Sequence, residues 1–313
     1  MSNNAEVGLY RRTLIKYLTH LFTNSLIDMN ILITGSNGQL GSEIRAIASQ
    51  FSNYNFFFTD IAELDLSNYK QVELYFEENT ISVCVNCAAY TAVDKAEDEQ
   101  DIAMLVNCDV VGNLAKVCSN NNALLIHVST DYVFDGTHYK PYEETDPTAP
   151  NSYYGLTKLK GEEAVFANTD KAVVIRTSWL YSSYGNNFVK TMIRLGKDRD
   201  ELGVVVDQIG TPTHAADLAM AIMKIVQKNG NNNIKEIYHY SNEGVISWYD
   251  FAIAIMKEAN ISCRVNAIES KDFPAKANRP FYSVLNKAKL KNDFQIEVPY
   301  WLDSLKVMIK QIG

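Results

Sequence analysis

A tyrosine and a lysine placed four residues apart could exchange protons with a substrate. Tyr154 and Lys158 stand in the segment Tyr-Gly-Leu-Thr-Lys, at the start of a predicted helix, so their side chains share one helix face. Tyrosine has an ordinary pKa of about 10, and a nearby cation favours the phenolate. We therefore expect Lys158 to lower the pKa of Tyr154 and Tyr154 to act as an acid–base group. The same pattern also fits an aromatic residue beside a solvated lysine.

A hydroxyl group is expected close to this pair. Ser129-Thr130 ends an apolar segment upstream of Tyr154, and the carboxyl ends of parallel strands form the ligand-binding edge of a sheet. A threonine at that edge can hold a substrate carbonyl oxygen. The candidate catalytic set is Thr130, Tyr154 and Lys158.

A glycine-rich segment between a strand and a helix predicts a dinucleotide site. Gly35-Ser-Asn-Gly38-Gln-Leu-Gly41 follows an apolar strand directly. Gly35 permits a tight turn, Gly38 lets the backbone approach a pyrophosphate, and Gly41 allows close helix packing. The helix N-terminus adds unpaired N–H groups and partial positive charge. A turn with only a structural role is the alternative.

Acidic residues after the second strand predict how the adenosine would be held. Asp60 can accept hydrogen bonds from ribose hydroxyls, although it could also be a plain turn residue. Asp65 and Leu66 are expected near the adenine. No arginine or lysine occurs between Arg45 and Lys70, which favours NAD over NADP. Small residues after the third strand, in Asn86-Cys-Ala-Ala89, leave room for the cofactor.

Alternating strands and helices are predicted to position these groups. The apolar strands are continuous rather than alternating, as in a parallel sheet buried on both faces. This predicts an α/β fold with a doubly wound, Rossmann-like parallel sheet. Strands are predicted at 30–34, 55–59, 82–87, 123–129 and 172–176, and helices at 39–50, 68–79, 101–119 and 153–167.

The pattern loosens after residue 180, which predicts a smaller C-terminal lobe. Helices are expected at 186–196, 215–228, 247–260 and 298–312, with short strands near Val204 and Ile237. We divide the chain into a dinucleotide-binding domain at 29–180 and a substrate-binding lobe at 181–313, packed closely on the sheet. Residues 1–28 are treated as an N-terminal extension outside the core fold, because the first strand begins only at Met29. A polar stretch after Arg11-Arg12 argues against an export signal.

Composition excludes several classes of protein. The 313 residues carry a net charge of −8, without the basic patch of a nucleic-acid binder. No apolar run reaches the roughly 18 residues of a membrane span. Five cysteines are too few for a disulfide scaffold. Cys84 and Cys87 point to opposite faces of one strand, so we expect buried, reduced thiols in a cytoplasmic protein.

Taken together, these motifs resemble the extended short-chain dehydrogenase/reductase family. Within it, the similarity is greatest to the branch of reductases that produce dTDP-L-rhamnose from its 4-keto precursor. Two segments are specific to that branch, Thr-Ala-Val-Asp-Lys-Ala-Glu97 and Asp207-Gln-Ile-Gly-Thr-Pro-Thr213. Further similarity lies in 129–136, 154–162, 176–181, 185–188 and Arg279-Pro280.

The resemblance implies an NADPH- or NADH-dependent oxidoreductase and a set of binding residues. The residues implied to bind the dinucleotide are Gly35, Gly38, Gln39, Leu40, Asp60, Ala88, Ala89, Tyr154 and Lys158. Those implied to line the sugar pocket are Val93, Thr130, Tyr132, Tyr154 and Trp179. Trp179 follows the fifth strand, so a buried core aromatic is the alternative there. The implied partners are a nucleotide-sugar substrate and a second copy of the chain, without nucleic acid or membrane.

Several features depart from the family or leave other functions open. Cys87 replaces an alanine, and the first 28 residues are foreign to the family. Metal-linked dimers occur in some relatives, but the acidic residues cannot be matched here, so no metal is expected. Asp131 after Thr130 would suit a dehydratase, and epimerases share the Tyr154/Lys158 pattern. The non-catalytic regulatory subunit of methionine adenosyltransferase resembles the same branch.

Overall fold

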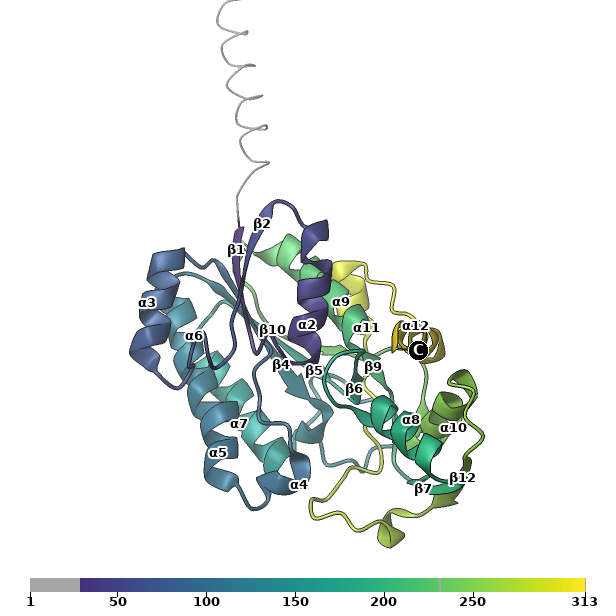
Figure 1. Ribbon diagram of the computed structural model, residues 1–313. Helices are drawn as coiled ribbons and strands as arrows, with labels where there is room; N and C mark the ends of the chain where they lie inside the picture. Colours follow the sequence, from purple (N-terminus) through teal and green to yellow (C-terminus); the bar gives the residue numbers. More distant parts are fainter. Residues whose placement is uncertain (1–28, 231, 313) are drawn as a thin grey trace, which may run out of the picture.

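Six parallel strands form the central sheet of the protein. The computed structural model describes residues 29–230 and 232–312, so the predictions for residues 1–28 lie outside the described chain. The strand order is β10-β5-β4-β3-β1-β2 (Figure 1). The strands are β1 Met29–Thr34, β2 Tyr54–Phe58, β3 Val83–Asn86, β4 Leu124–Thr130, β5 Ala172–Thr177 and β10 Lys235–Tyr240. The predicted doubly wound parallel sheet is confirmed.

Helices cover both faces of this sheet. One face packs against α2 (Gln39–Ile47), α9 (Ala215–Asn229) and α11 (Ala288–Phe294), through a core that includes Ile31 and Ile33. The other face packs against α3 (Tyr69–Asn79), α6 (Val110–Asn120) and α7 (Tyr153–Asn168), through a core that includes Leu32. Cys84 belongs to the second core and Cys87 packs against the first, so the prediction of opposite faces is confirmed.

The structure differs from the predicted domain division in one respect. The strand near Ile237 is β10, which pairs with β5 and completes the central sheet. α9 and α11 likewise lie beyond residue 180 and cover a face of that sheet. The sequence did not indicate this placement, because a strand's pairing partner depends on contacts across a long chain segment. The chain therefore leaves the sheet after β5, builds part of the lobe, returns to add β10 and then builds the rest of the lobe.

The C-terminal lobe has a separate apolar core around Phe251 and Leu305. It is built on α8 (Phe188–Asp198), α10 (Trp248–Glu258) and α12 (Trp301–Ile312). Its paired strands are short: β7 (Glu201–Val205) with β12 (Arg264–Ile268), β8 (Ile209–Gly210) with β11 (Ile246–Ser247), and β6 (Leu180–Tyr181) with β9 (Thr213–His214).

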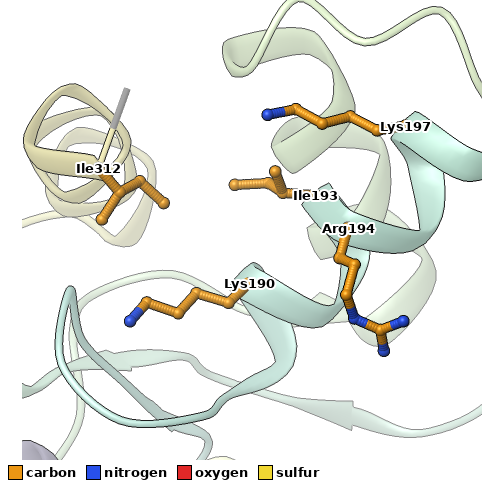
Figure 2. A pocket seen from close by; sticks show the side chains of 5 residues that line it. All are labelled: Lys190, Ile193, Arg194, Lys197 and Ile312. Atoms are coloured by element: carbon orange, nitrogen blue, oxygen red, sulfur yellow. The ribbon is translucent and has the colours of Figure 1, made fainter.

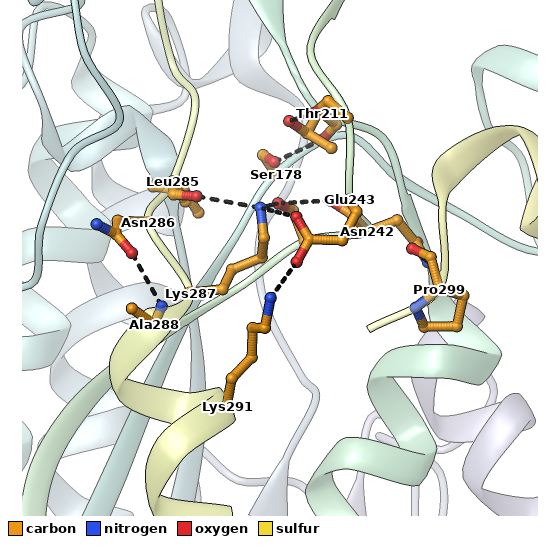
Figure 3. A network of polar contacts seen from close by, with 12 residues as sticks. Ser178, Thr211, Asn242, Glu243, Leu285, Asn286, Lys287, Ala288, Lys291 and Pro299 are labelled. Carbon is orange, nitrogen blue, oxygen red and sulfur yellow. Dashed lines mark hydrogen bonds and ion pairs between the residues drawn. The ribbon is translucent and has the colours of Figure 1, made fainter. Parts of the chain in front are cut away.

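Polar contacts join this lobe to the ends of β5 and β10. Ser178 donates to the Thr211 carbonyl and Thr211 donates to the Gly244 carbonyl, each at 2.7 Å (Figure 3). Glu243 lies between two lysines, with Lys291 at 2.7 Å and the buried Lys287 at 3.5 Å. The Ser178 and Thr211 contacts are buried or partly buried, whereas the Glu243–Lys291 pair is exposed. Together they link the loops that border the carboxyl edge of the sheet.

The helix predicted at 101–119 contains a local irregularity. It runs as α5 (Gln100–Met104), a π-helical turn at Leu105–Asp109 and α6. By length and composition Gln100–Asn120 could cross a membrane, yet the apolar residues of α6 pack in the core against the sheet and α7, while Ile102 and Leu105 are exposed. A π-turn inserts an extra residue into the helix, and such turns are frequent at functional sites. Here the turn carries Asn107 toward α7, where its amide donates to the Thr157 hydroxyl at 3.0 Å.

Candidate active site

The glycine-rich loop adopts the tight turn expected of it. Gly35 has φ +60°, and a Cβ there would lie 2.7 Å from the backbone of Ala88. Only glycine fits that position, because the loop backbone rests directly on the end of β3. Gly38 is the extended residue before α2, where a Cβ would meet only the Gly35 carbonyl. Gly41 packs against Ser36 of the same loop, rather than against a strand.

A cavity of about 260 Å³ opens beside this loop. Five of the residues predicted to hold the dinucleotide line it: Gly35, Asp60, Asp65, Leu66 and Ala88. Its outer wall is apolar, with Ile61, Ile102 and Leu105 exposed on the surface. Polar groups at the loop and an apolar wall for a flat base suit the adenosine half of a dinucleotide.

Asp60 also supports the loop. One carboxylate oxygen accepts from the Asn37 backbone N–H at 3.0 Å and the other from Ile61 at 2.9 Å. Asp65 is engaged differently, because the Ser67 hydroxyl and N–H hold its pKa below the ordinary value. No arginine or lysine lies between Arg45 and Lys70, but Arg45 itself donates to the Ser36 hydroxyl of the loop at 2.8 Å. A positive charge therefore lies close to the loop, and sequence spacing alone did not reveal it.

Two predicted cofactor residues are occupied by contacts within the protein. The Leu40 side chain is buried in the core between α2 and the sheet, so only its backbone N–H remains for a ligand. The Gln39 amide oxygen accepts from Asn187 of the lobe at 3.0 Å. Gln39 therefore joins α2 to the lobe.

Ala89 is half-buried just after the cavity residue Ala88.

The structure brings Thr130 and Tyr154 together. Thr130 ends β4, and Ser152 caps the start of α7 by accepting from Gly155. Burial raises the pKa of Tyr154 to about 12, partly offset by a hydrogen bond with Thr130. Thr130 also donates to Asp131 at 3.0 Å. The phenol is therefore protonated at neutral pH.

Lys158 contacts β4 in this arrangement. Its amine donates to the Val128 carbonyl at 2.8 Å and lies 3.4 Å from Nε2 of His127. Burial lowers the pKa of Lys158 to about 8, against the opposing effect of Glu162. In this arrangement the amine is directed to β4 and burial dominates the pKa of Tyr154, so the expected lowering of that pKa by Lys158 stays a prediction.

Aromatic side chains surround Tyr154. Tyr132 meets it edge to face, with ring centroids 5.6 Å apart, and Val93 packs in the same cluster. Val93 begins α4 (Val93–Ala96), a short helix that sequence patterns did not predict. Four of the five predicted sugar-pocket residues, Val93, Thr130, Tyr132 and Tyr154, thus lie in one place.

Trp179 lies apart from that cluster. Its ring stacks on Trp248 of α10 with centroids 3.7 Å apart, and it has φ +48°. The side chain is half-buried, which matches neither a fully buried core aromatic nor an open pocket wall. Trp248 was missed, because an aromatic residue at a helix start carries no distinctive signal.

Residues 276–279 of the C-terminal lobe, here called the Arg279 strap, contact α4 and the residues that follow it. Arg279 donates to Asp94 at 2.7 Å, and the Ala277 N–H donates to the other carboxylate oxygen at 3.0 Å. Asp94 adjoins Val93 in α4, so the Arg279–Asp94 pair holds the short helix that supplies Val93 to the aromatic cluster. Arg279 and Asp94 stand in segments that resemble the family, but their pairing was not predicted from the sequence.

A second hollow, of about 590 Å³, lies between α8 and α12 (Figure 2). Lys190, Arg194 and Lys197 border it with two isoleucines. It contains none of the residues predicted to bind cofactor or substrate. This hollow is therefore separate from the predicted cofactor and sugar residues.

Comparisons with known proteins agree over nearly the whole described chain. The family model described as the RmlD substrate binding domain matches residues 29–313. A dTDP-4-dehydrorhamnose reductase of Aggregatibacter actinomycetemcomitans is 42% identical over 285 residues, covering 88% of this chain and 97% of the relative.

Two solved structures have the same architecture. A dTDP-4-dehydrorhamnose reductase from Clostridium acetobutylicum has 42% identity and a TM-score of 0.86, covering 91% of this chain and 99% of that one. A dTDP-4-dehydrorhamnose reductase from Bacillus anthracis, solved in complex with NADP, has 38% identity and a TM-score of 0.87. It covers 91% of this chain and 100% of that one.

Proposed function

The chain belongs to the RmlD substrate binding domain family, and on that premise we propose that it reduces the C4 keto group of dTDP-4-dehydro-L-rhamnose to give dTDP-L-rhamnose. The observation that carries the proposal is the pairing of two features along one sheet edge. A cavity suited to adenosine lies beside the glycine loop, and a protonated tyrosine lies beside a threonine at the end of β4.

The residues at the sheet edge fit a nicotinamide dinucleotide. Gly35 brings the loop backbone onto β3, the start of α2 presents free N–H groups, and Asp60 stands at the cavity. When bound, the reduced dinucleotide supplies the hydride. NADPH and NADH are both candidates, since Asp60 suits a free ribose while Arg45 offers a cation near the loop.

The chain's own groups manage the proton and the position of the sugar. Tyr154 keeps its phenolic proton at neutral pH and can release it to an oxygen that becomes negative. The Thr130 hydroxyl can hold that oxygen by a hydrogen bond. Tyr132 and Val93 supply apolar surface for the sugar ring.

The direct test is coupled turnover of dTDP-4-dehydro-L-rhamnose with NADPH and, separately, with NADH. We expect stoichiometric oxidation of the reduced nicotinamide and formation of dTDP-L-rhamnose. An epimerase or dehydratase would change the sugar without net oxidation, because such enzymes regenerate their cofactor. Asp131, buried beside Thr130, is the one residue that favours a dehydratase.

We also propose that the protein acts in the cytoplasm, on a soluble nucleotide sugar, without a nucleic-acid or membrane partner. A homodimer is the assembly to test, by light scattering at several protein concentrations. A stoichiometric methionine adenosyltransferase partner, recovered by pulldown, would instead support a regulatory subunit.

A further inference from the structure

A chain of buried hydrogen bonds connects β1 to the catalytic lysine. The Thr34 hydroxyl donates to Asn86 Oδ1 at 2.7 Å, and Asn86 Nδ2 lies 3.1 Å from Nδ1 of His127. Nε2 of His127 lies 3.4 Å from the Lys158 amine, which donates to the Val128 carbonyl. His127 is 0% exposed and is the one polar side chain within an otherwise apolar run of β4.

The direction of donation in this chain is set by a backbone group. The Ala88 N–H donates to Asn86 Oδ1 at 3.2 Å, so this atom is the amide oxygen and Nδ2 is the donor toward His127. Turning the Asn86 amide over would set its NH₂ group against the Ala88 N–H. Leaving that partly buried donor unpaired would be costly.

The imidazole tautomer follows from this direction. Nδ1 accepts from Asn86, so the proton of the neutral ring is on Nε2, which faces Lys158. An Nε2–H group can donate only to an amine with a free lone pair. A protonated ammonium has none and would meet the N–H with like polarity.

We propose that His127 is a positioning residue for Lys158: its Nε2–H donates to the neutral amine and holds it against β4, and protonation of the amine breaks this contact. The inference rests on the proposed function, in which Lys158 belongs to the catalytic set. It gives the enzyme a lysine with two states, one held by both His127 and the Val128 carbonyl and one held by that carbonyl alone.

The other charged and titratable groups around the amine do not produce this effect. Glu162 lies one turn along α7 and favours the charged amine, although it also forms an ion pair with Arg176 of β5 at 2.7 Å. Tyr154 lies one turn earlier and is neutral. Burial keeps the pKa of His127 well below its ordinary value, so the ring stays neutral.

The test uses nuclear magnetic resonance on the whole protein without substrate. Long-range ¹H–¹⁵N spectra report the histidine tautomer, and ¹³Cε shifts report titration of Lys158, assigned with Lys158→Met. We expect His127 in the Nε2–H form. His127→Phe should raise the Lys158 midpoint by about one pH unit, because a hydrogen bond to the neutral form is lost.

Asn86→Asp is the second variant and keeps the ring in place. Its carboxylate accepts from Nδ1–H, which reverses the tautomer and makes Nε2 an acceptor for the ammonium, so the midpoint should again rise. Thr157→Val is the matched control. Thr157 is as buried as its neighbour Lys158, and the substitution removes two hydrogen bonds that do not belong to the hydrogen-bond chain from Thr34 to Lys158.

Two results would overturn the proposal: an Nδ1–H tautomer in the wild-type protein, or midpoints for His127→Phe and Asn86→Asp no higher than that of Thr157→Val. Neither readout needs turnover. If the sugar assay fails and these shifts appear, the proposed substrate is wrong and the role of His127 stands.

Discussion

At the scale of single residues, Tyr154 is the strongest candidate for the proton donor. Tyr154→Phe should keep the fold and dinucleotide binding but lower kcat by about 10²–10⁴-fold, the usual contribution of an acid–base group. Steady-state kinetics, with dinucleotide affinity measured by fluorescence, check this. A kcat near that of the wild type would remove Tyr154 from the mechanism.

Asp60 is expected to set cofactor preference. Its carboxylate suits the two free ribose hydroxyls of NADH and repels a 2′-phosphate. Asp60→Ala should therefore raise KM for NADH more than for NADPH. Because Asp60 also supports Asn37 of the loop, both constants can change, and their ratio is the quantity to measure. An unchanged ratio would place Asp60 away from the ribose.

Asp131 should make stability depend on pH. Burial raises its pKa to about 6, so between pH 4 and 6 the folded protein keeps a proton that the unfolded chain loses. The stability contributed by this group therefore falls as pH rises through that window, by roughly 3 kcal/mol. Urea unfolding at pH 4 and pH 7 should show that the free energy of unfolding of Asp131→Asn rises relative to that of the wild type at the higher pH. A constant difference between the two proteins would contradict the burial effect.

At the scale of elements, the Trp179–Trp248 stack joins the end of β5 to α10. Trp179→Ala should destabilise the protein by about 2–3 kcal/mol, less than for a fully buried tryptophan, since the ring is half-buried. A double-mutant cycle with Trp248→Ala should give a coupling of about 0.5–1.5 kcal/mol.

The sugar KM tests the second role predicted for Trp179. If the ring also covers the sugar, KM rises in Trp179→Ala, while Trp248→Phe, which keeps an aromatic partner, serves as the control. An unchanged KM with the same loss of stability would make Trp179 purely structural.

Several elements were predictable because their signals are local. Continuous apolar strands such as Ile31–Ile33 predict burial on both faces, and Gly35 marks a turn that only glycine fits. The place of β10 in the sheet was not predictable, since Lys-Glu-Ile-Tyr-His-Tyr reads as a strand without indicating its neighbour. The direction of the Lys158 side chain was also hidden, because its amine contacts residues of β4, which is a separate element.

At the scale of the whole molecule, the Arg279 strap links the two parts of the structure across the α4 segment. Arg279→Gln should change the melting temperature little, because partly exposed ion pairs contribute under about 1 kcal/mol. It should raise the sugar KM several-fold, because the Arg279–Asp94 pair holds α4, whose Val93 packs in the aromatic cluster. Lys276→Gln, which removes the neighbouring pair with Asp98, is the control. Equal KM values for the two variants would remove Arg279 from the pocket.

The return of the chain to β10 has a consequence during synthesis on the ribosome. β5 emerges early, but its partner strand emerges only after residues 178–234 have been made. Until then the nascent sheet presents β5 as an open edge, and α9 has not yet covered the adjacent apolar face. A ribosome-bound chain of this length exposes an unpaired strand edge and an uncovered apolar face. This is therefore the interval in which a ribosome-associated chaperone would bind the chain.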